Sequence, residues 1–104
     1  MFVRTDLSLA QQSVQSCHAA IECANLFNLK SLHDHPSVII LAAKNLSKLQ
    51  QAGSFLKGHH VEYVEFREPD MDHELTAIAT EPIYDKDRGL FKKFQLLRPK
   101  GGAS

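Results

Sequence analysis

The chain has little cysteine and no net charge. Two of its 104 residues are cysteines, and its 12 basic side chains are matched by 12 acidic ones. Cys17 and Cys23 lie on one predicted helix, roughly 9 Å apart along its axis, and point in different directions. They cannot form a disulfide without unwinding that helix, which excludes the cysteine framework of a small secreted domain. The charge balance excludes the overall basic field that is typical of dedicated nucleic-acid-binding proteins.

Several other signals are missing. The sequence has no signal peptide and no apolar run long enough to cross a membrane, which predicts a cytoplasmic protein without a membrane partner. It has neither a P-loop nor a Gly-x-Gly-x-x-Gly element, so no cofactor is expected. The histidines of His33-x-His35 and His59-His60 fall in predicted loops and match no zinc-ligand pattern, so no metal site is expected.

The composition is otherwise that of a globular protein. Hydrophobic residues make up 43% of the chain, which is enough for a buried core. At this length they predict one domain, residues 1–98, followed by a disordered tail, residues 99–104. Opposite charges gather in different segments, because six acidic residues lie within 62–74 and six basic residues within 86–100. A balanced total can therefore hide local patches.

Hydrophobic periodicity predicts alternating strands and helices. Strands are expected at 1–4, 37–42, 61–67 and 74–81, helices at 9–28, 46–57 and 85–91, and a further extended segment at 94–97 that packs back on the domain. The continuous apolar run at 37–42 indicates a strand that is buried on both faces and therefore central in the sheet. Asn45 or Ser47 is expected to cap the second helix, and Gly58 to end it.

The order of these elements predicts the fold class. Two strand–helix–strand crossovers imply parallel strand pairs, and the short link between the last two strands implies an antiparallel edge. The expected architecture is a three-layer α/β domain with a mixed four-stranded sheet flanked by helices. In such sheets, sites lie at the carboxyl ends of strands. Asp6 follows the first strand, and Glu68 and Asp70 follow the third, so these two loops are expected to meet.

The first predicted helix carries an apolar stripe and a polar stripe. At about 100° per residue, one side gathers Ala10, Val14, Cys17, Ile21 and Ala24. We expect this apolar stripe to pack in the core and to leave Cys17 inert. The adjoining polar stripe consists of Gln11, Gln15, His18 and Glu22. Asp6 or Ser8 is expected to cap the helix, whose N-terminus is a natural place to hold a phosphate.

Two stretches of the chain combine residue types at fixed spacing. The first is Arg4-Thr-Asp6-Leu7 followed by Val14-Gln15-Ser-Cys-His18-Ala19. The second is Arg67-Glu68-Pro-Asp70 followed by Thr76-Ala-Ile-Ala-Thr-Glu-Pro82. With these motifs and its closing segment, the chain resembles the type II peptidyl-tRNA hydrolases, the archaeal and eukaryotic kind, over nearly its whole length.

The chain also departs from that family. The catalytic lysine of the family's Gly-Lys element has no counterpart, because Gln11 or Gln12 stands there. The family's Asp-Ala-Gly-Arg-Thr loop is replaced by Glu68-Pro-Asp-Met-Asp. In both respects the chain is similar to a divergent subgroup of peptidyl-tRNA hydrolase domain proteins.

The resemblance implies a metal-independent, homodimeric hydrolase that cleaves the ester between a peptide and its tRNA. That reaction needs an activated water, an oxyanion donor and a grip on RNA. The implied catalytic residues are Gln15 as the oxyanion donor, His18 oriented by Glu22, Glu68 or Asp70 as the base, and Thr76 as a water ligand. The residues expected to contact the substrate are Arg4, Asp6, Gln11, Lys92 and Lys93, with Phe91 and Phe94 available for stacking.

Each of these assignments has a structural alternative. His18 can simply hydrogen-bond a neighbouring backbone group, and the glutamine stripe can form a solvated shoulder or a dimer surface. Glu68 and Asp70 suit a turn, and the two adjacent lysines suit a solvated face. The alternative function is therefore a non-catalytic module of the same fold, which binds RNA or a protein partner and has lost the family's lysine.

Overall fold

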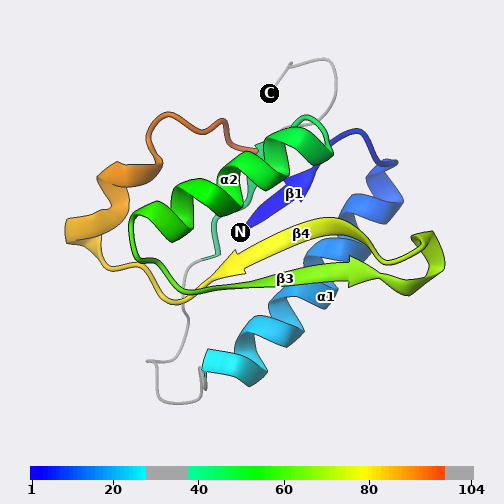
Figure 1. Ribbon diagram of the computed structural model, residues 1–104, viewed down its shortest axis with the longest axis horizontal. Coiled ribbons are helices and arrows are strands. Elements are labelled where there is room, and N and C mark those ends of the chain that lie inside the picture. The colour runs from blue at the N-terminus through cyan, green and yellow to red at the C-terminus, as the bar shows by residue number, and fades with distance from the viewer. Residues whose placement is uncertain (28–37, 98–104) are drawn as a thin grey trace.

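The computed structural model describes residues 1–27 and 38–97, which form one sheet between two helices (Figure 1). The elements are β1 (Phe2–Arg4), α1 (Leu9–Phe27), β2 (Leu41–Ala43), α2 (Leu46–Gly58), β3 (Tyr63–Glu68), the 3-10 turn η2 (Pro69–Met71), β4 (Glu74–Thr80) and the 3-10 helix η3 (Asp85–Phe91). The expected loop at 29–36, with His33 and His35, and the expected tail at 99–104 lie outside the described residues. Within the described ranges, no helix is long and apolar enough to cross a membrane.

The four strands form a mixed sheet in the order β2-β1-β4-β3. β1 pairs in parallel with β2, and β4 runs antiparallel to both β1 and β3, which confirms the mixed sheet and its antiparallel edge. The second expected parallel pair is wrong, because β1 and β4 separate β3 from β2. The central position expected for 37–42 is also wrong, since β2 lies at the opposite edge. Val38 and Ile39, which precede it, are exposed.

The outer edge of β2 is covered by the C-terminal part of the described chain. The Ala42 N–H donates to the Gln95 carbonyl at 2.8 Å, and the Leu97 N–H donates to the Ile40 carbonyl at 2.9 Å. These bonds confirm that the extended segment at 94–97 packs back on the domain. They also satisfy edge groups that would otherwise invite pairing with another chain.

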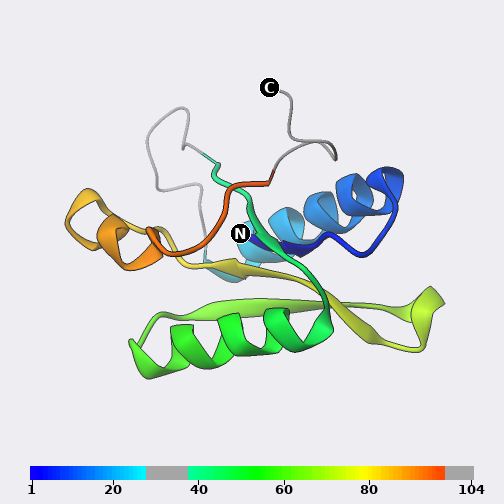
Figure 2. The ribbon, with the colours of Figure 1, turned by 90° about the horizontal axis from the view of Figure 1, so that it is seen from above.

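Each helix packs on its own face of the sheet, α2 on one side and α1 on the other (Figure 2). Side chains alternate along β1, so Phe2 belongs to the α2 side and Val3 to the α1 side. The α2 cluster contains Phe2, Leu41, Ala43, Leu49, Ala52, Leu56, Leu75 and Ile78. The α1 cluster contains Val3, Ala19, Cys23, Ala77 and Ala79. Most large apolar side chains are therefore buried beneath α2.

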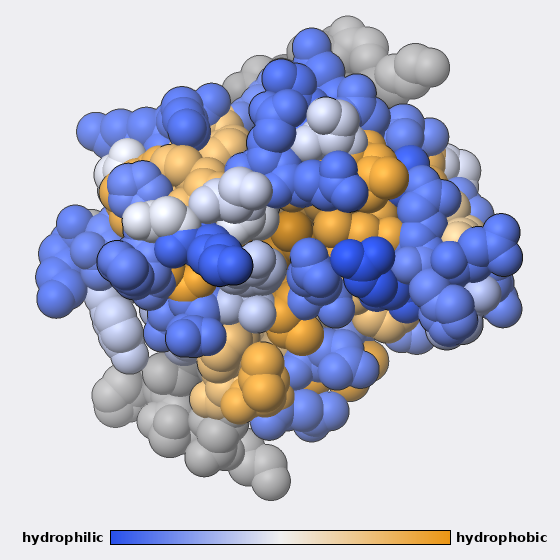
Figure 3. Space-filling model, viewed as in Figure 1, coloured by the Kyte–Doolittle hydropathy of each residue, from blue (hydrophilic) through white to orange (hydrophobic). Residues whose placement is uncertain are grey.

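Both ends of α2 are closed by local contacts. The Asn45 side chain accepts the Lys48 backbone N–H at 2.9 Å, which confirms the expected cap. Gly58 is the last helical residue, as expected, but the left-handed residue beyond it is His60, with φ 58°. The N–H groups that follow bond back to carbonyls of the last turn, in the arrangement that favours glycine at the left-handed position. Seen from the α2 side, polar side chains cover most of the surface (Figure 3).

The predicted packing of α1 is wrong. Its buried residues are Gln12, Gln15, Ala19 and Cys23. The stripe that was expected in the core, Ala10, Val14, Cys17, Ile21 and Ala24, is exposed. The physical reason lies in the sheet beneath α1, where Thr76 and Glu68 hydrogen-bond to Gln15. An apolar helix face at this place would leave buried polar groups without partners.

Candidate functional site

A β-bulge brings Thr76 to the α1 face of the sheet. Phe66 pairs with Ala77 and Arg67 pairs with Leu75, so Thr76 is an extra residue in β4. Leu75 belongs to the α2 cluster, whereas Ala77 belongs to the α1 cluster and Thr76 contacts α1. Thr76 and Ala77, although consecutive in β4, therefore both face α1. Bulges often re-aim side chains in this way beside functional sites.

The buried amide of Gln15 joins β4 to the acidic bend between β3 and β4. The Thr76 hydroxyl donates to Gln15 Oε1 at 2.8 Å, and Gln15 Nε2 donates to Glu68 Oε2 at 2.9 Å. Gln15 is only 3% exposed and Thr76 is fully buried. The expected approach of the acidic loop to the first helix is thus confirmed by a direct hydrogen bond.

The Glu68 carboxylate is held in its ionised form at the surface. Besides Gln15, it is bonded by the Asp70 backbone N–H, which donates to Oε1 at 3.2 Å. The hydrogen bond from Gln15 lowers the pKa of Glu68 below its ordinary value, and the Asp70 N–H and the charge of His18 add to the effect. Glu68 is half-buried. A negative charge therefore stands beside α1 at neutral pH.

The bend that carries Glu68 turns sharply. Asp72 and His73 are both in the left-handed region, with φ 54° and 59°. The His73 N–H donates to the Glu68 carbonyl at 3.0 Å and closes the turn. Consecutive non-glycine residues in this region are uncommon, and aspartate and histidine are among those that adopt it most readily.

The His18 imidazole lies flat against the ring of Phe66 at the edge of this cluster. The two rings are 4.8 Å apart between centroids and 7° from parallel. His18 is exposed, and so are Glu22, one turn further along α1, and Asp70 on η2. Stacking fixes the plane of the imidazole while leaving it open to solvent, near enough to Glu68 for its charge to act on that carboxylate.

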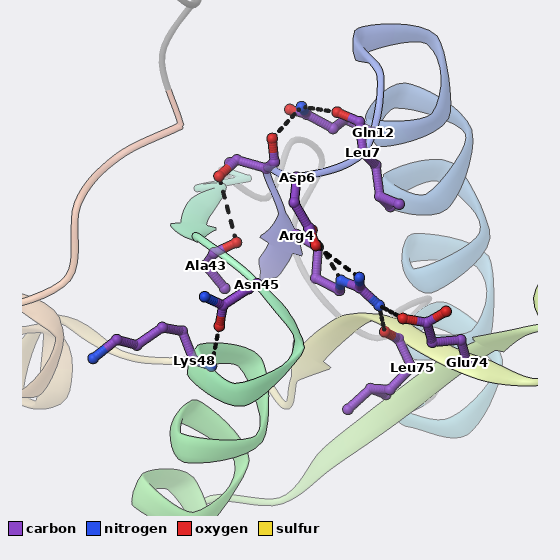
Figure 4. A network of polar contacts seen from close by, with 10 residues as sticks. Arg4, Asp6, Leu7, Gln12, Ala43, Asn45, Lys48, Glu74 and Leu75 are labelled. Atoms are coloured by element: carbon purple, nitrogen blue, oxygen red, sulfur yellow. Dashed lines mark hydrogen bonds and ion pairs between the residues drawn. The ribbon is translucent and has the colours of Figure 1, made fainter.

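Arg4 ties β1 to the following loop and to β4 (Figure 4). Its Nε donates to Asp6 Oδ1 at 3.0 Å and its Nη2 to Asp6 Oδ2 at 2.8 Å. Nη1 contacts the Glu74 carboxylate and donates to the Leu75 carbonyl at 3.1 Å. The hydrogen bond with Asp6 raises the pKa of Arg4 and lowers that of Asp6. Arg4 is 6% exposed, so its donors serve the protein in place of the phosphate contact that was expected.

The start of α1 is ordered by two further side chains. Ser8, the second of the two expected caps, accepts the Gln11 backbone N–H at 3.2 Å, while Asp6 binds Arg4. Gln11 itself is exposed. The buried Gln12 amide donates to the Leu7 carbonyl at 2.8 Å and holds the loop against the helix (Figure 4).

A cleft of about 1130 Å³ opens at the carboxyl ends of β1 and β2. Lys44, Lys48 and Lys93 line it, together with Phe55 and Phe94. The Lys93 ammonium lies 4.2 Å from the centre of the Phe55 ring and 5.3 Å from that of Phe94. In Figure 4 the Lys48 side chain points away from the Arg4 network. The cleft therefore combines the charges of these lysines with an aromatic wall. Among the described residues that line it, the one carboxylate is that of Asp6, which is paired with Arg4.

The structure gathers Gln15, His18, Glu68 and Thr76 where α1 meets the acidic bend. Of the two expected phosphate-binding lysines, Lys93 lines the cleft and Lys92 is exposed beside it. Sequence reasoning missed Lys44 and Lys48, although both follow a strand whose carboxyl end lies at the site edge of the sheet. In the described part of the chain, no group of three or more His, Cys, Asp or Glu residues is arranged to hold a metal.

No family model, curated protein or solved structure matches the chain. The resemblance to peptidyl-tRNA hydrolases thus rests on the sequence motifs alone, and any function must be argued from the site.

Proposed function

We propose that the domain is a divergent relative of the type II peptidyl-tRNA hydrolases and cleaves the ester between a peptide and tRNA. One observation carries the proposal: the buried Gln15 amide connects Thr76 to Glu68 and so holds an ionised carboxylate close to the exposed His18 imidazole. A carboxylate near a solvent-accessible imidazole favours the protonated form that the imidazole takes when it acts as a general base.

In the proposed reaction, His18 accepts a proton from a water that attacks the ester carbonyl carbon. The Glu68 carboxylate stabilises the imidazolium that forms. The imidazolium then returns the proton to the departing 3′ oxygen of the tRNA as the carbon–oxygen ester bond breaks. Gln15 and Thr76 are too deeply buried to touch a substrate, so we assign them positioning roles instead of the oxyanion and water contacts expected from the sequence.

The lysine-lined cleft supports an RNA substrate. Lys44, Lys48 and Lys93 offer charges for backbone phosphates, and Phe55 and Phe94 offer aromatic surface near them. Asp6 lies on this cleft and also binds Arg4, which contacts Glu74 of β4. The same network therefore borders the cleft and orders the strand that carries Thr76.

A second candidate function is a non-catalytic module that binds RNA through the cleft. It is favoured by the glutamines that stand where the family has its catalytic lysine, and by the burial of two of the polar residues that a hydrolase would use. The two proposals share the cleft and differ only in whether His18 and Glu68 turn over a substrate.

Turnover of peptidyl-tRNA by the purified protein separates the two functions. Wild type, His18→Ala and Glu68→Gln are compared with Glu65→Gln, which removes an exposed carboxylate from the same strand. Hydrolysis by wild type and Glu65→Gln, with about a hundredfold loss in the other two, supports the enzyme. Wild-type hydrolysis no faster than that in buffer alone would contradict the enzymatic function.

Binding to tRNA at increasing salt tests the cleft independently of turnover. Lys48→Ala is expected to weaken binding and flatten the salt dependence by about one phosphate contact. Lys57→Ala, at the other end of α2, serves as the matched control and should have no effect. Binding that does not respond to salt would remove the RNA contact from both proposals.

A further inference from the structure

β3 is the edge strand of the sheet (Figure 1), and in the described part of the chain its outer side pairs with no other strand. Just before β3, the Glu62 N–H donates to the Glu81 carboxylate at 2.8 Å, and the Glu62 carbonyl accepts the Glu81 N–H at 2.9 Å. At the other end of β3, the Glu68 carbonyl accepts the His73 N–H at 3.0 Å. Both ends therefore direct backbone groups toward the β4 side, and the residues between them alternate between the two sides of the strand.

This alternation turns the N–H and C=O groups of Tyr63, Glu65 and Arg67 outward. An edge with unpaired backbone groups is a template for another extended chain, unless charged side chains block it. The Glu65 and Arg67 side chains lie on the α2 face, where they bond to each other at 3.3 Å. The α1 face of the edge is formed by the half-buried Val64 and Phe66. The edge is therefore apolar on the side that faces α1.

The buried stripe of α1 continues past this edge. Its four buried residues are at most 8% exposed: Gln12, Gln15, Ala19 and Cys23. Leu26 is next in the same spacing of three and four residues, yet it is 61% exposed. Figure 1 shows the reason, because α1 runs obliquely behind the sheet and its C-terminal half extends beyond β3. One further strand beside β3 would pack on this half of α1 and cover Leu26.

α1 and β3 run in opposite directions. Late in α1, Cys23 contacts the carbonyl of Thr80, which pairs with the first residue of β3. Earlier in α1, His18 stacks on Phe66, which is nearer the carboxyl end of β3. A chain that follows β3 in parallel therefore passes Leu26 first and reaches His18 afterwards.

The carboxyl end of β3 also lies on the same side of the molecule as the lysine-lined cleft. β1 and β3 both run antiparallel to β4, so they are parallel to each other, and β2 is parallel to β1. The cleft opens where β1 and β2 end, and Glu68 is the last residue of β3. A chain that follows β3 in parallel is thus directed toward the end of the sheet that carries the cleft.

We propose that the peptide part of the substrate binds as a fifth strand parallel to β3, with its esterified carboxyl end at His18 and its preceding residues over Leu26. This inference rests on the proposed hydrolase function and deepens it. The tRNA then leaves toward the end of the sheet where the lysine-lined cleft opens. Main-chain hydrogen bonds give affinity without reading side chains, so peptides of different sequence should bind alike.

Titration of the ¹⁵N-labelled protein with the capped peptide acetyl-Ala-Val-Ala-Val-amide tests this binding mode without turnover. The outward N–H groups of Glu65 and Arg67 should show the largest shifts. Those of Val64 and Phe66, which face β4, should show the smallest. Shifts confined to the lysine-lined cleft, or no shift at several millimolar peptide, would overturn the proposal.

Two pairs of variants test the contacts with the same peptide. Leu26→Ser should raise the dissociation constant about tenfold, because the peptide loses its apolar cover. Ile21→Ser is the matched control, since Ile21 is 59% exposed on the same helix but faces away from the sheet. Glu65→Pro removes one outward N–H and should raise the dissociation constant about fivefold, whereas Glu65→Ala keeps that N–H and should not. Equal dissociation constants within both pairs contradict a strand at this edge.

Hydrolysis of acyl-tRNAs that carry one to four amino-acid residues links the binding mode to the reaction. kcat/KM should rise as residues are added, because β3 offers about 20 Å of edge, and it should then level off. The rise should be lost in Leu26→Ser and kept in Ile21→Ser. Hydrolysis that ignores peptide length refutes the added strand alone. Peptide binding at β3 without any hydrolysis refutes the proposed function and leaves the peptide site standing.

Discussion

The two helices of this domain use their apolar residues in opposite ways. α2 buries Leu49, Ala52 and Leu56 against the sheet and exposes polar side chains. α1 buries two glutamines with Ala19 and Cys23 and turns its longest apolar stripe to the outside. α2 therefore stabilises the fold, whereas α1 carries a polar cluster on one side and an exposed apolar stripe on the other. An apolar stripe at helical spacing identifies an apolar face of a helix, but it does not by itself show that this face packs on the sheet.

The largest expected difference is between truncations of an apolar side chain on each of the two helices. Leu49→Ala should lower the free energy of unfolding by about 3 kcal/mol, because Leu49 is fully buried in the α2 cluster. Val14→Ala should change it by about 0.5 kcal/mol or less, since the side chain is half exposed. Urea unfolding measures both. Equal losses in the two variants would contradict the outward orientation of α1.

The next largest effect concerns the buried amide. Gln15→Met keeps the side-chain volume but removes the partners of Thr76 and Glu68, which should cost about 1–2 kcal/mol of stability. The pKa of Glu68 should rise toward its ordinary value, because the Gln15 hydrogen bond is the main cause of its depression. NMR titration of the Glu68 carboxyl carbon follows the pKa. Gln51→Met, at an exposed site on α2, is the control and should alter neither quantity.

A smaller effect is expected where α2 ends. His60→Gly should raise stability by about 1 kcal/mol, because glycine adopts the left-handed conformation at φ 58° without a steric penalty. His59→Gly, where φ is −99°, should bring no gain. Thermal unfolding of the two variants measures the change in stability of each. An equal rise in both would mean that the left-handed conformation is not the cause.

The smallest effect is the pH dependence contributed by Glu68, because water screens a half-buried carboxylate. Its pKa is lower in the folded chain than in the unfolded chain, so acid favours unfolding. The stability that ionised Glu68 contributes is complete above the ordinary glutamate pKa of about 4.5, and it is lost as the pH falls from there through the lower pKa of the folded chain. Glu68→Gln should therefore lose less stability than wild type between pH 6 and pH 3. Glu65→Gln is the control, and a steeper loss in Glu68→Gln than in wild type would be the contrary result.

Local sequence patterns predicted the positions of most helices and strands in the described chain. The alternating segment at 61–67 and the apolar segment at 74–81 became β3 and β4, and the Asn45 cap begins α2 as expected. The contact between the acidic bend and the first helix was also predictable, because both follow strand ends on one edge of the sheet. Short-range spacing and turn chemistry suffice for such features.

The errors arose where a distant segment decided the outcome. The apolar run before β2 indicated a central strand, but β2 lies at the edge and is covered by Gln95 and Leu97 from the far end of the described chain. The bulge that turns Thr76 toward α1 leaves no mark in the alternation of β4. Arg4 was expected to contact a phosphate. Its guanidinium instead contacts the carboxylate of Glu74, which lies 70 residues later in the chain.

By itself, the amino-acid sequence determined the order of the helices and strands in the described chain and the approximate limits of most of them, because backbone preference and hydrophobic periodicity act over a few residues. It also determined that one helix bears an apolar row beside a polar row. Only the tertiary structure decided that the face on the sheet is neither of these rows but Gln12, Gln15, Ala19 and Cys23. Burying Gln15 satisfied the polar groups that β4 and the acidic bend present there, and that requirement outweighed the transfer of Val14 and Ile21 from water.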